Sequence, residues 1–147
     1  MRYRKAVFIV AYRKEKNKIL YLLLKRKLHW TGWEFPKGAI KKNEPIIKAL
    51  KREIKEETGQ KTERIKKHNF SGRYKYEKQY KDRPGFTGQT YTLYSAEIKT
   101  KKIKLDRKEH SAYKWLSYKQ ALLLLTWKNQ KKSLRIANKK ITKSKLS

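Results

Sequence analysis

The stretch GAIKKNEPIIKALKREIKEETG, from Gly38 to Gly59, carries the strongest structural signals in this 147-residue chain. Pro45 suits the first turn of a helix, where its missing backbone N–H costs nothing. No glycine or proline follows until Gly59, which can adopt the left-handed conformation that ends a helix. Apolar residues recur at every fourth position, as in a buried stripe: Ile46, Leu50 and Ile54. The stretch therefore predicts a helix over residues 45–58.

Three glutamates lie on one face of this predicted helix, because Glu53, Glu56 and Glu57 occupy positions i, i+3 and i+4. Like charges at this spacing repel each other, and the chain has only 12 acidic residues in total. Clustered carboxylate oxygens are the ligands that Mg²⁺ and Mn²⁺ require. A solvated acidic face, balanced by neighbouring lysines, is the alternative that the spacing alone leaves open.

The full pattern is more specific than the acidic cluster. It comprises seven positions: Gly38, Glu44, Arg52, Glu53, Glu56, Glu57 and Gly59. If each residue type occupies roughly one position in fifteen, a chance match is on the order of one in 10⁸ per starting point. This pattern is the Nudix box, and the chain resembles the Nudix hydrolases. The box usually closes on an aliphatic residue, where this chain has Gln60, and we expect that change to affect packing rather than chemistry.

The resemblance implies an enzyme that hydrolyses a pyrophosphate linkage with Mg²⁺ or Mn²⁺. The implied metal ligands are the Gly38 carbonyl oxygen and the carboxylates of Glu53, Glu56 and Glu57. Glu57 or Glu56 would polarise the attacking water. Arg52 would pair with Glu44 and orient the catalytic helix without touching substrate. The implied fold is α+β, an α/β/α sandwich with a mixed β-sheet, the catalytic helix on one side and a C-terminal helix.

Two further segments look like those of asymmetric diadenosine tetraphosphate hydrolases. The first precedes and opens the box, and reads His29-Trp30-Thr31 and then Phe35-Pro36-Lys37-Gly38. The second is the run Glu109-His110-Ser111-Ala112-Tyr113-Lys114-Trp115-Leu116. The Trp-Leu part of this run recurs in many Nudix proteins, and the Glu-His part in fewer of them.

This second resemblance implies further site residues. Glu109 would be an extra metal ligand or an alternative catalytic base, Lys37 would hold a phosphate oxygen, and His29 would lie near the polyphosphate. Tyr74 or Tyr76 would stack on an adenine, since an aromatic face is a suitable platform for a base. Ordinary alternatives remain: the tyrosines also suit packing on a sheet face, His29 a surface loop, and Glu109 charge balance among lysines.

The rest of the chain predicts strands on both sides of the central helix. The expected strands cover residues 5–12, 19–24, 64–76, 90–98 and 112–116. The first is almost continuously apolar, which is typical of a strand buried on both faces, and forms a hairpin with the second. Ser117 and Gln120 form a capping box for a helix that would continue to Ile136. We expect a Nudix hydrolase domain over residues 1–137 and a basic, flexible tail over residues 138–147.

The composition is extremely basic, with 42 Lys and Arg residues and a net charge of +30. Such a charge attracts polyanions such as nucleotides and RNA. A lysine-rich composition without any dedicated nucleic-acid surface is the alternative. The absence of cysteine excludes disulfides, a thiol nucleophile and a zinc–thiolate site. No run of about 18 apolar residues predicts a membrane span, so we expect a cytoplasmic protein whose oligomeric state is open.

We expect hydrolysis of a nucleoside polyphosphate, with a dinucleoside tetraphosphate such as Ap4A as the favoured substrate. Removal of pyrophosphate from the 5′ end of RNA is the enzymatic alternative, because that class shares a Trp-x-Phe-Pro segment before the box and the charge suits RNA. Many of those enzymes have glutamine after the proline, where this chain has Lys37. Cleavage of a nucleotide sugar such as ADP-ribose comes third. A basic nucleic-acid-binding module on a Nudix scaffold is the alternative of another class, against which the complete box argues.

Overall fold

The computed structural model describes residues 2–146, with side chains as far as Lys143. The elements follow one another along the chain as β1 (Tyr3–Glu15), β2 (Lys18–Arg26), β3 (Gly32–Glu34), β4 (Lys37–Ala39), α1 (Ile46–Thr58), β5 (Glu63–Lys75), β6 (Gly88–Glu97), β7 (His110–Leu116), α2 (Tyr118–Leu124) and α3 (Lys128–Leu146). Within this described range, no helix is both long enough and apolar enough to cross a membrane.

Strand β1 is the centre of a mixed sheet with the order β3-β2-β1-β6-β5. It pairs in parallel with β6 on one edge, and antiparallel with both β2 and β4 on the other. The contacts with β4 involve residues 6–8 of β1 and those with β2 involve residues 12–15, so the two partners share that edge. Strand β7 adds to β2 and places His110 opposite Arg26. The expected hairpin of the first two strands is confirmed.

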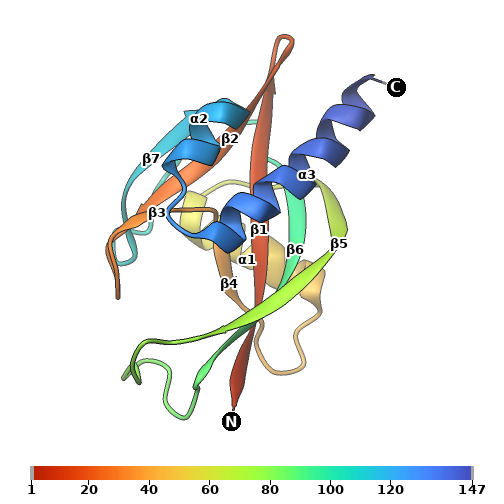
Figure 1. Cartoon of the computed structure of the whole chain (residues 1–147). Coiled ribbons are helices and arrows are strands. Elements are labelled where there is room, and N and C mark those ends of the chain that lie inside the picture. The colour runs from red at the N-terminus through yellow and green to blue at the C-terminus, as the bar shows by residue number, and fades with distance from the viewer. Residues whose placement is uncertain (1, 147) are drawn as a thin grey trace.

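Alternate residues of β1 contribute to two cores on opposite faces of the sheet, because side chains along a strand alternate in direction. Phe8, Val10 and Tyr12 belong to the cluster that includes residues of α2 and α3. Val7, Ile9 and Ala11 belong to the cluster that includes Leu50 and Ile54 of α1. Helix α3 crosses one face of the sheet and α1 lies behind the other (Figure 1). The expected α/β/α sandwich is confirmed. The expected burial of its first strand on both faces is confirmed as well.

Helix α1 has nearly the predicted bounds. Pro45 is its N-cap in an extended conformation, and Gly59 ends it with a left-handed φ of 73°. The prediction that Ile46 belongs to the buried stripe is wrong, because this residue begins the first turn and is 36% exposed. The buried residues of the helix are Ala49, Leu50, Glu53, Ile54, Glu57 and Thr58. Two carboxylates therefore share the buried face with the apolar stripe.

The C-terminal region differs from the expectation of one helix running to Ile136. The predicted capping box of Ser117 and Gln120 is present, but α2 ends at Leu124 and α3 begins at Lys128. The break occurs because Thr126 exchanges two hydrogen bonds with the backbone of Trp33, which holds the connection in a non-helical conformation. The segment expected to be a flexible tail is helical as far as Leu146, and Ile141 packs into the core.

Candidate active site

The buried end of α1 opens into a cavity of about 200 Å³ that holds most of the predicted site residues. Its charged lining consists of the acidic residues Glu53, Glu56, Glu57, Asp106 and Glu109 and the basic residues Arg4, Arg26, Lys37 and Arg83. We call it the acidic cavity. Gly38 and Ala39 of β4 and Gln89 of β6 complete the lining. The site thus combines carboxylates that suit a metal ion with cations that suit phosphate.

Glu57 is the most deeply buried of these carboxylates, with 2% of its surface exposed. Its Oε2 accepts a hydrogen bond from the backbone N–H of Lys37 at 3.2 Å. Glu57, Glu109 and His110 each place one potential ligand atom within 4.8 Å of the other two. Burial, followed by the charges of surrounding carboxylates, raises the pKa of Glu57 well above its ordinary value. A divalent cation at this point would offset that repulsion, and two carboxylates with an imidazole nitrogen are donors that a divalent metal ion accepts.

Glu53 and Glu56 line the same cavity, but their carboxylates contact Arg52. The Arg52 Nη1 donates to Glu53 Oε1 at 2.7 Å and lies 3.4 Å from both oxygens of Glu56. Burial raises the pKa of Glu53 to about 7 even though Arg52 opposes the change. The structure therefore gathers Glu57 and Glu109 with His110, whereas the two other glutamates of the predicted metal set contact Arg52, the buried Glu53 as well as the exposed Glu56.

The expected pair of Arg52 and Glu44 is present in a bidentate form. Arg52 Nε and Nη2 donate to the two carboxylate oxygens of Glu44, each at 2.9 Å. Nη2 also donates to the carbonyl oxygen of Ala39 at 2.8 Å. One guanidinium thus connects α1 to β4 and to the loop between them, which sets the orientation of the helix.

Gly38 lies directly against the Glu53 carboxylate. A Cβ atom built at this position would collide with the carboxyl carbon and the Oε2 of Glu53, so only glycine leaves room for that side chain. This contact gives the box glycine a steric role. Coordination of a metal by the Gly38 carbonyl oxygen stays a prediction.

A buried charge network beneath the acidic cavity was not predicted from the sequence. Glu34 is fully buried; its Oε2 lies 2.7 Å from His110 Nε2 and accepts a hydrogen bond from Arg26 Nη1 at 3.1 Å. Lys37 Nζ lies 3.5 Å from the other Glu34 oxygen. A signal was available, because Glu34 stands between Trp33 and Phe35 in an apolar segment, where a charged side chain needs a buried partner.

A second and larger cavity, of about 640 Å³, adjoins the first. Both cavities are lined by Arg26, Lys37 and Arg83. The aromatic residues of the larger one are Phe8, Trp30, Tyr74, Tyr76, Tyr80 and Trp127, and we call it the aromatic cleft. The predicted substrate-binding residues Lys37, His29, Tyr74 and Tyr76 all line it.

The predicted residues of the cleft also contact one another. Lys37 Nζ donates to the hydroxyl oxygen of Tyr74 at 3.3 Å, and the rings of Tyr74 and Tyr76 meet edge to face with centroids 6.2 Å apart. Tyr74 also packs against the hydrophobic core, so the same side chain contributes to the packing of the sheet face and to the wall of the cleft. His29 lies farther out, with Nε2 3.0 Å from Asp82 Oδ1 and its ring stacked on Tyr80 at 4.0 Å.

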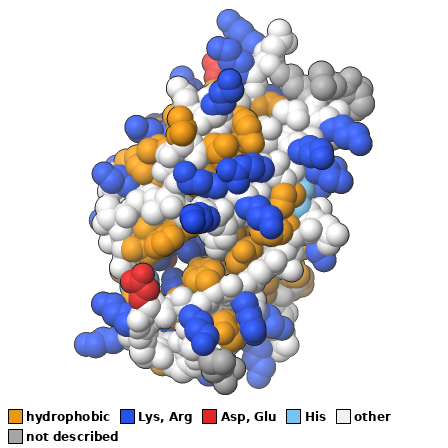
Figure 2. Space-filling view, in the orientation of Figure 1, with side chains coloured by type: hydrophobic (Ala, Val, Ile, Leu, Met, Phe, Trp, Pro, Cys, Tyr) orange, Lys and Arg blue, Asp and Glu red, His pale blue; other side chains and the backbone are white. Residues whose placement is uncertain are grey.

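The basic charge is spread over the visible surface rather than gathered in one arm. Figure 2 shows Lys and Arg side chains over the whole face that carries α2 and α3, with few acidic side chains among them. Helix α3 has no Asp or Glu in its sequence. The acidic cavity is therefore a local cluster of carboxylates on a strongly positive protein. The positive field of the surrounding surface attracts anionic substrates.

Comparisons with known proteins identify the fold. The family model described as the NUDIX domain matches residues 2–136. A search of curated proteins found no match. Among solved structures, an Ap4A hydrolase from C. elegans in a binary complex is similar, with a TM-score of 0.76, 24% identity and coverage of 95% of this chain and 98% of that one.

Two other solved structures show the same fold. The E. coli dihydroneopterin triphosphate pyrophosphohydrolase has a TM-score of 0.75 and 21% identity, over 94% of this chain and 99% of that one. The NUDIX domain of Shewanella oneidensis NrtR, complexed with ADP ribose, has a TM-score of 0.77 and 15% identity, over 96% of this chain and 90% of that one. At these identities the likeness concerns the fold alone.

Proposed function

The chain belongs to the Nudix family of pyrophosphohydrolases, which act on nucleoside diphosphate derivatives, and from that premise we propose that its substrate is a dinucleoside tetraphosphate such as Ap4A. The observation that carries this proposal is the shared wall of the two cavities. Arg26, Lys37 and Arg83 line both the acidic cavity and the aromatic cleft. If the base of a ligand lay in the aromatic cleft, its polyphosphate would therefore extend past these three cations toward the carboxylates of the acidic cavity.

Hydrolysis requires neutralisation of the phosphate charge, placement of the reacting atoms and activation of water. Lys37 and Arg83 would bind the phosphate oxygens and orient the chain, while the buried Arg26 is held by Glu34. A divalent ion held by Glu57 and Glu109 would withdraw charge from the phosphoryl group and lower the pKa of a bound water. Water adds to one phosphorus, the bridging P–O bond breaks, and the leaving phosphate carries the electron pair, so Ap4A gives ATP and AMP.

The positions of the tyrosines support a base at the cleft wall. Tyr74 lies beside Lys37, and Tyr76 is held by a hydrogen bond from its hydroxyl to Gln89 Oε1 at 3.1 Å. An adenine stacked on either ring would leave its phosphates near Lys37. Glu53, Glu56, Glu57 and Glu109 are the candidates for the residue that receives the proton of the attacking water, and Arg52 would act only by positioning α1.

Removal of pyrophosphate from the 5′ end of RNA is the second candidate. The basic surface around α3 favours it, because an RNA chain continuing from the site would cross a face rich in lysine. A nucleic-acid-binding module without catalysis is a third reading, which the assembled carboxylates disfavour. Our proposal is that the protein acts as a cytoplasmic Mg²⁺ or Mn²⁺ enzyme on a small dinucleotide.

The test is a parallel assay of Ap4A, 5′-triphosphorylated RNA and ADP-ribose with Mg²⁺, with products separated by ion exchange. The proposal expects ATP and AMP from Ap4A at the highest kcat/KM of the three, with the activity lost in Glu57→Gln. Preferential release of pyrophosphate from RNA would mean that RNA, and not Ap4A, is the substrate. RNA binding without turnover of any substrate, with Mg²⁺ or Mn²⁺, would reject both enzymatic readings.

A further inference from the structure

Helix α3 carries a line of cations along its exposed side. They occupy positions i, i+4, i+7, i+11 and i+15, which lie on one face of a helix, and all of them are exposed: Lys128, Lys132, Arg135, Lys139 and Lys143. At 1.5 Å per residue, the line extends for roughly 22 Å. We call it the basic stripe. Figure 2 shows Lys and Arg side chains over the face of the molecule that carries this helix.

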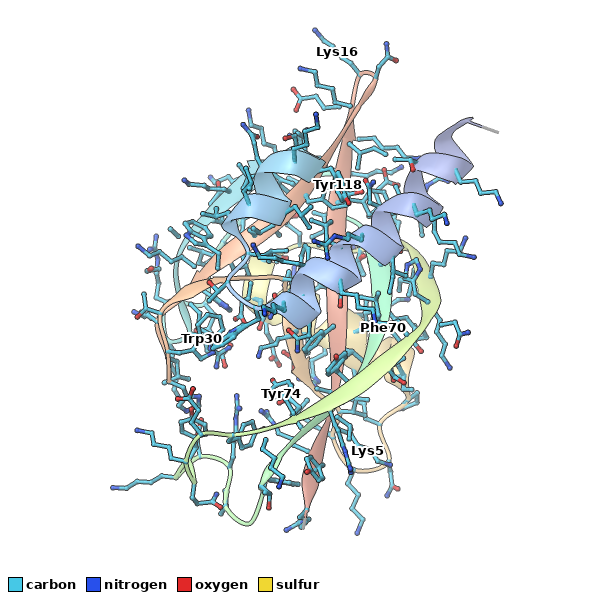
Figure 3. All side chains as sticks on the ribbon, in the orientation of Figure 1. Lys5, Lys16, Trp30, Phe70, Tyr74 and Tyr118 are labelled. Carbon is cyan, nitrogen blue, oxygen red and sulfur yellow. The ribbon has the colours of Figure 1, made fainter. Side chains whose placement is uncertain are left out.

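The opposite side of α3 is buried, which fixes the direction of the basic stripe. Its buried residues are Gln130, Ser133, Leu134, Ala137 and Ile141. The Tyr21 hydroxyl donates a hydrogen bond to Asn138 Oδ1 at 2.6 Å, and Lys132 Nζ lies 5.2 Å from the centre of the Phe70 ring of β5. Figure 3 shows Phe70 beside α3. Because the buried side and these contacts prevent the helix from rotating, the basic stripe is directed toward solvent.

The positive charge of α3 is not balanced by acidic residues of the protein. The chain has no Asp or Glu after Glu109. In the part of the chain that the structure describes, none of the cations of the basic stripe forms an ion pair. Helix α1 differs, because its exposed lysines Lys48, Lys51 and Lys55 share the helix with the glutamates of the box. Of these two helices, α3 is therefore the one whose charge an external anion would neutralise.

This distribution of charge is unfavourable for α3 when nothing is bound to it. Like charges at positions i and i+4 repel each other, as between Lys128 and Lys132 and between Arg135 and Lys139. The first turn has no acidic residue, although the positive end of the helix dipole lies there and favours anions. A polyanion along the basic stripe would relieve both effects. The arrangement therefore suits a ligand with negative charges at regular intervals, such as a nucleic acid backbone.

The surroundings of the basic stripe favour a single strand of nucleic acid over a membrane or a duplex. A helix that lies on a membrane inserts its apolar side among the lipids, but the apolar side of α3 belongs to the hydrophobic core. A helix that reads a duplex projects into the major groove, whereas α3 lies across the face of the sheet (Figure 1). A flexible single strand can follow the stripe, which begins at Lys128 in the lining of the aromatic cleft.

We propose that the basic stripe of α3 is a docking surface for the phosphate backbone of single-stranded RNA, separate from the site of hydrolysis. Phosphate contacts carry no information about the base sequence, so this surface binds RNA of any sequence. It holds the protein on RNA whichever small nucleotide the acidic cavity accepts. The choice of RNA over DNA rests on the proposed function, because the substrates considered there are ribonucleotides.

The test compares two triple variants with the same change in net charge. The stripe variant combines Lys132→Gln, Arg135→Gln and Lys139→Gln. The control variant combines Lys48→Gln, Lys51→Gln and Lys55→Gln on α1, which lies behind the other face of the sheet. The ligand is a fluorescent oligouridylate of about 12 nucleotides, within the usual range of single-strand site sizes. It has a 5′ hydroxyl group and is used without metal ions, so it offers no polyphosphate to the site of hydrolysis.

Binding is measured by fluorescence anisotropy over a range of salt concentrations. For single strands, the logarithm of the affinity falls by about 0.7 per phosphate contact for each tenfold rise in salt. We expect the stripe variant to reduce the magnitude of this slope by about 2 and to weaken binding by about 10- to 100-fold at about 0.1 M salt, because three contacts are lost. The control variant should weaken binding by less than about threefold. A variant that retains the charges, with Lys132→Arg, Arg135→Lys and Lys139→Arg, should bind like the wild type.

Equal weakening by the stripe and control variants would overturn the proposal, because binding would then come from the general positive charge. The proposal would also fail if the wild type did not bind the oligouridylate. Tighter stripe-dependent binding of single-stranded DNA, of an RNA duplex or of polyglutamate would reject single-stranded RNA as the occupant. A urea unfolding curve should show the stripe variant at least as stable as the wild type, since repulsion along α3 is reduced.

Hydrolysis of Ap4A separates this inference from the proposed function. If the basic stripe binds RNA but the wild type does not cleave Ap4A, the substrate assignment fails and the docking surface stands. If the wild type cleaves Ap4A and the stripe variant binds RNA as tightly as the wild type, the docking surface fails and the substrate assignment stands.

Discussion

Glu34 and His110 lie 76 positions apart in the chain, yet His110 Nε2 and Glu34 Oε2 are 2.7 Å apart and both side chains are fully buried. Burial opposes ionisation of Glu34, but the charges and hydrogen bonds of Lys37, His110 and Arg26 outweigh it and lower the pKa of Glu34 to about 2. The floor of the site is therefore a charged carboxylate. Its cationic partner Lys37 lines both cavities, so the network links the core to the groups that face substrate.

Replacement of Glu34 by glutamine should destabilise the fold strongly. Glu34→Gln preserves the shape of the side chain but leaves the buried Arg26 without its counter-charge. Because breaking a buried ion pair costs about 3–5 kcal/mol, we expect the free energy of unfolding, measured with urea, to fall by that amount. The matched control is Glu63→Gln, since Glu63 is exposed and pairs with Lys99 at 3.1 Å on the surface; its loss should stay below about 1 kcal/mol. Equal small losses in the two variants would contradict a structural role for the buried pair.

Arg52→Lys should impair catalysis while leaving substrate affinity nearly intact. Lysine retains the charge but cannot bind both oxygens of Glu44 together with the Ala39 carbonyl, so α1 loses the contacts that orient it. Loss of a group that orients metal ligands costs about 10- to 100-fold in activity or metal affinity. We expect kcat to fall by that factor and the Mg²⁺ concentration for half-maximal activity to rise. Lys51→Arg, on the exposed face of the same helix, is the control. A rise in KM with kcat unchanged would instead mean that Arg52 binds substrate directly.

Glu57→Gln should stabilise the metal-free protein and abolish its response to metal. Burial and neighbouring carboxylates raise the pKa of Glu57, so its charge is unfavourable when no cation is bound. Removing the charge should raise the free energy of unfolding by about 1–2 kcal/mol, or the Tm by roughly 2–8 °C. The wild type should gain further stability from added Mg²⁺ or Mn²⁺, because a ligand that binds only the folded state stabilises it. In Glu57→Gln this gain should largely disappear. A metal-induced Tm rise that survives the substitution would remove Glu57 from the metal ligands.

The sequence predicted those parts of the fold and site that depend on local patterns. The apolar run of β1, the hairpin with β2 and the bounds of α1 follow from periodicity and from Pro45 and Gly59, and the structure confirms them. The ion pair of Arg52 and Glu44 follows from the box motif, because both partners lie within it. Each of these features depends on residues that are close together in the chain.

The features that were missed depend on contacts between distant segments. Nothing in the run of leucines before Thr126 signals the end of α2, because the break is imposed by the backbone of Trp33, 93 positions earlier. Because of the same contact, Trp127, which was predicted to lie within a helix, lines the aromatic cleft instead. The apolar neighbours of Glu34 signal a buried partner but do not identify it, and His110 becomes that partner only when β7 pairs with β2.

His68 should make the protein less stable in mild acid. Its side chain is buried, with a ring nitrogen 2.8 Å from Ser95 Oγ, and burial, together with Lys66 and Lys140, lowers its pKa from 6.5 to about 4. The unfolded chain therefore binds about one more proton than the folded one between these pH values, and stability falls as the pH drops from about 6.5 toward 4. We expect His68→Gln to reduce the slope of the unfolding free energy against pH in this window, as measured by urea denaturation at pH 7, 5.5 and 4.5. His110→Gln is unsuitable as a control because it breaks the pair with Glu34, so Gln60→Ala, which removes a half-buried and uncharged side chain, serves instead. If His68→Gln and wild type lost stability in parallel throughout this range, another group would carry the titration.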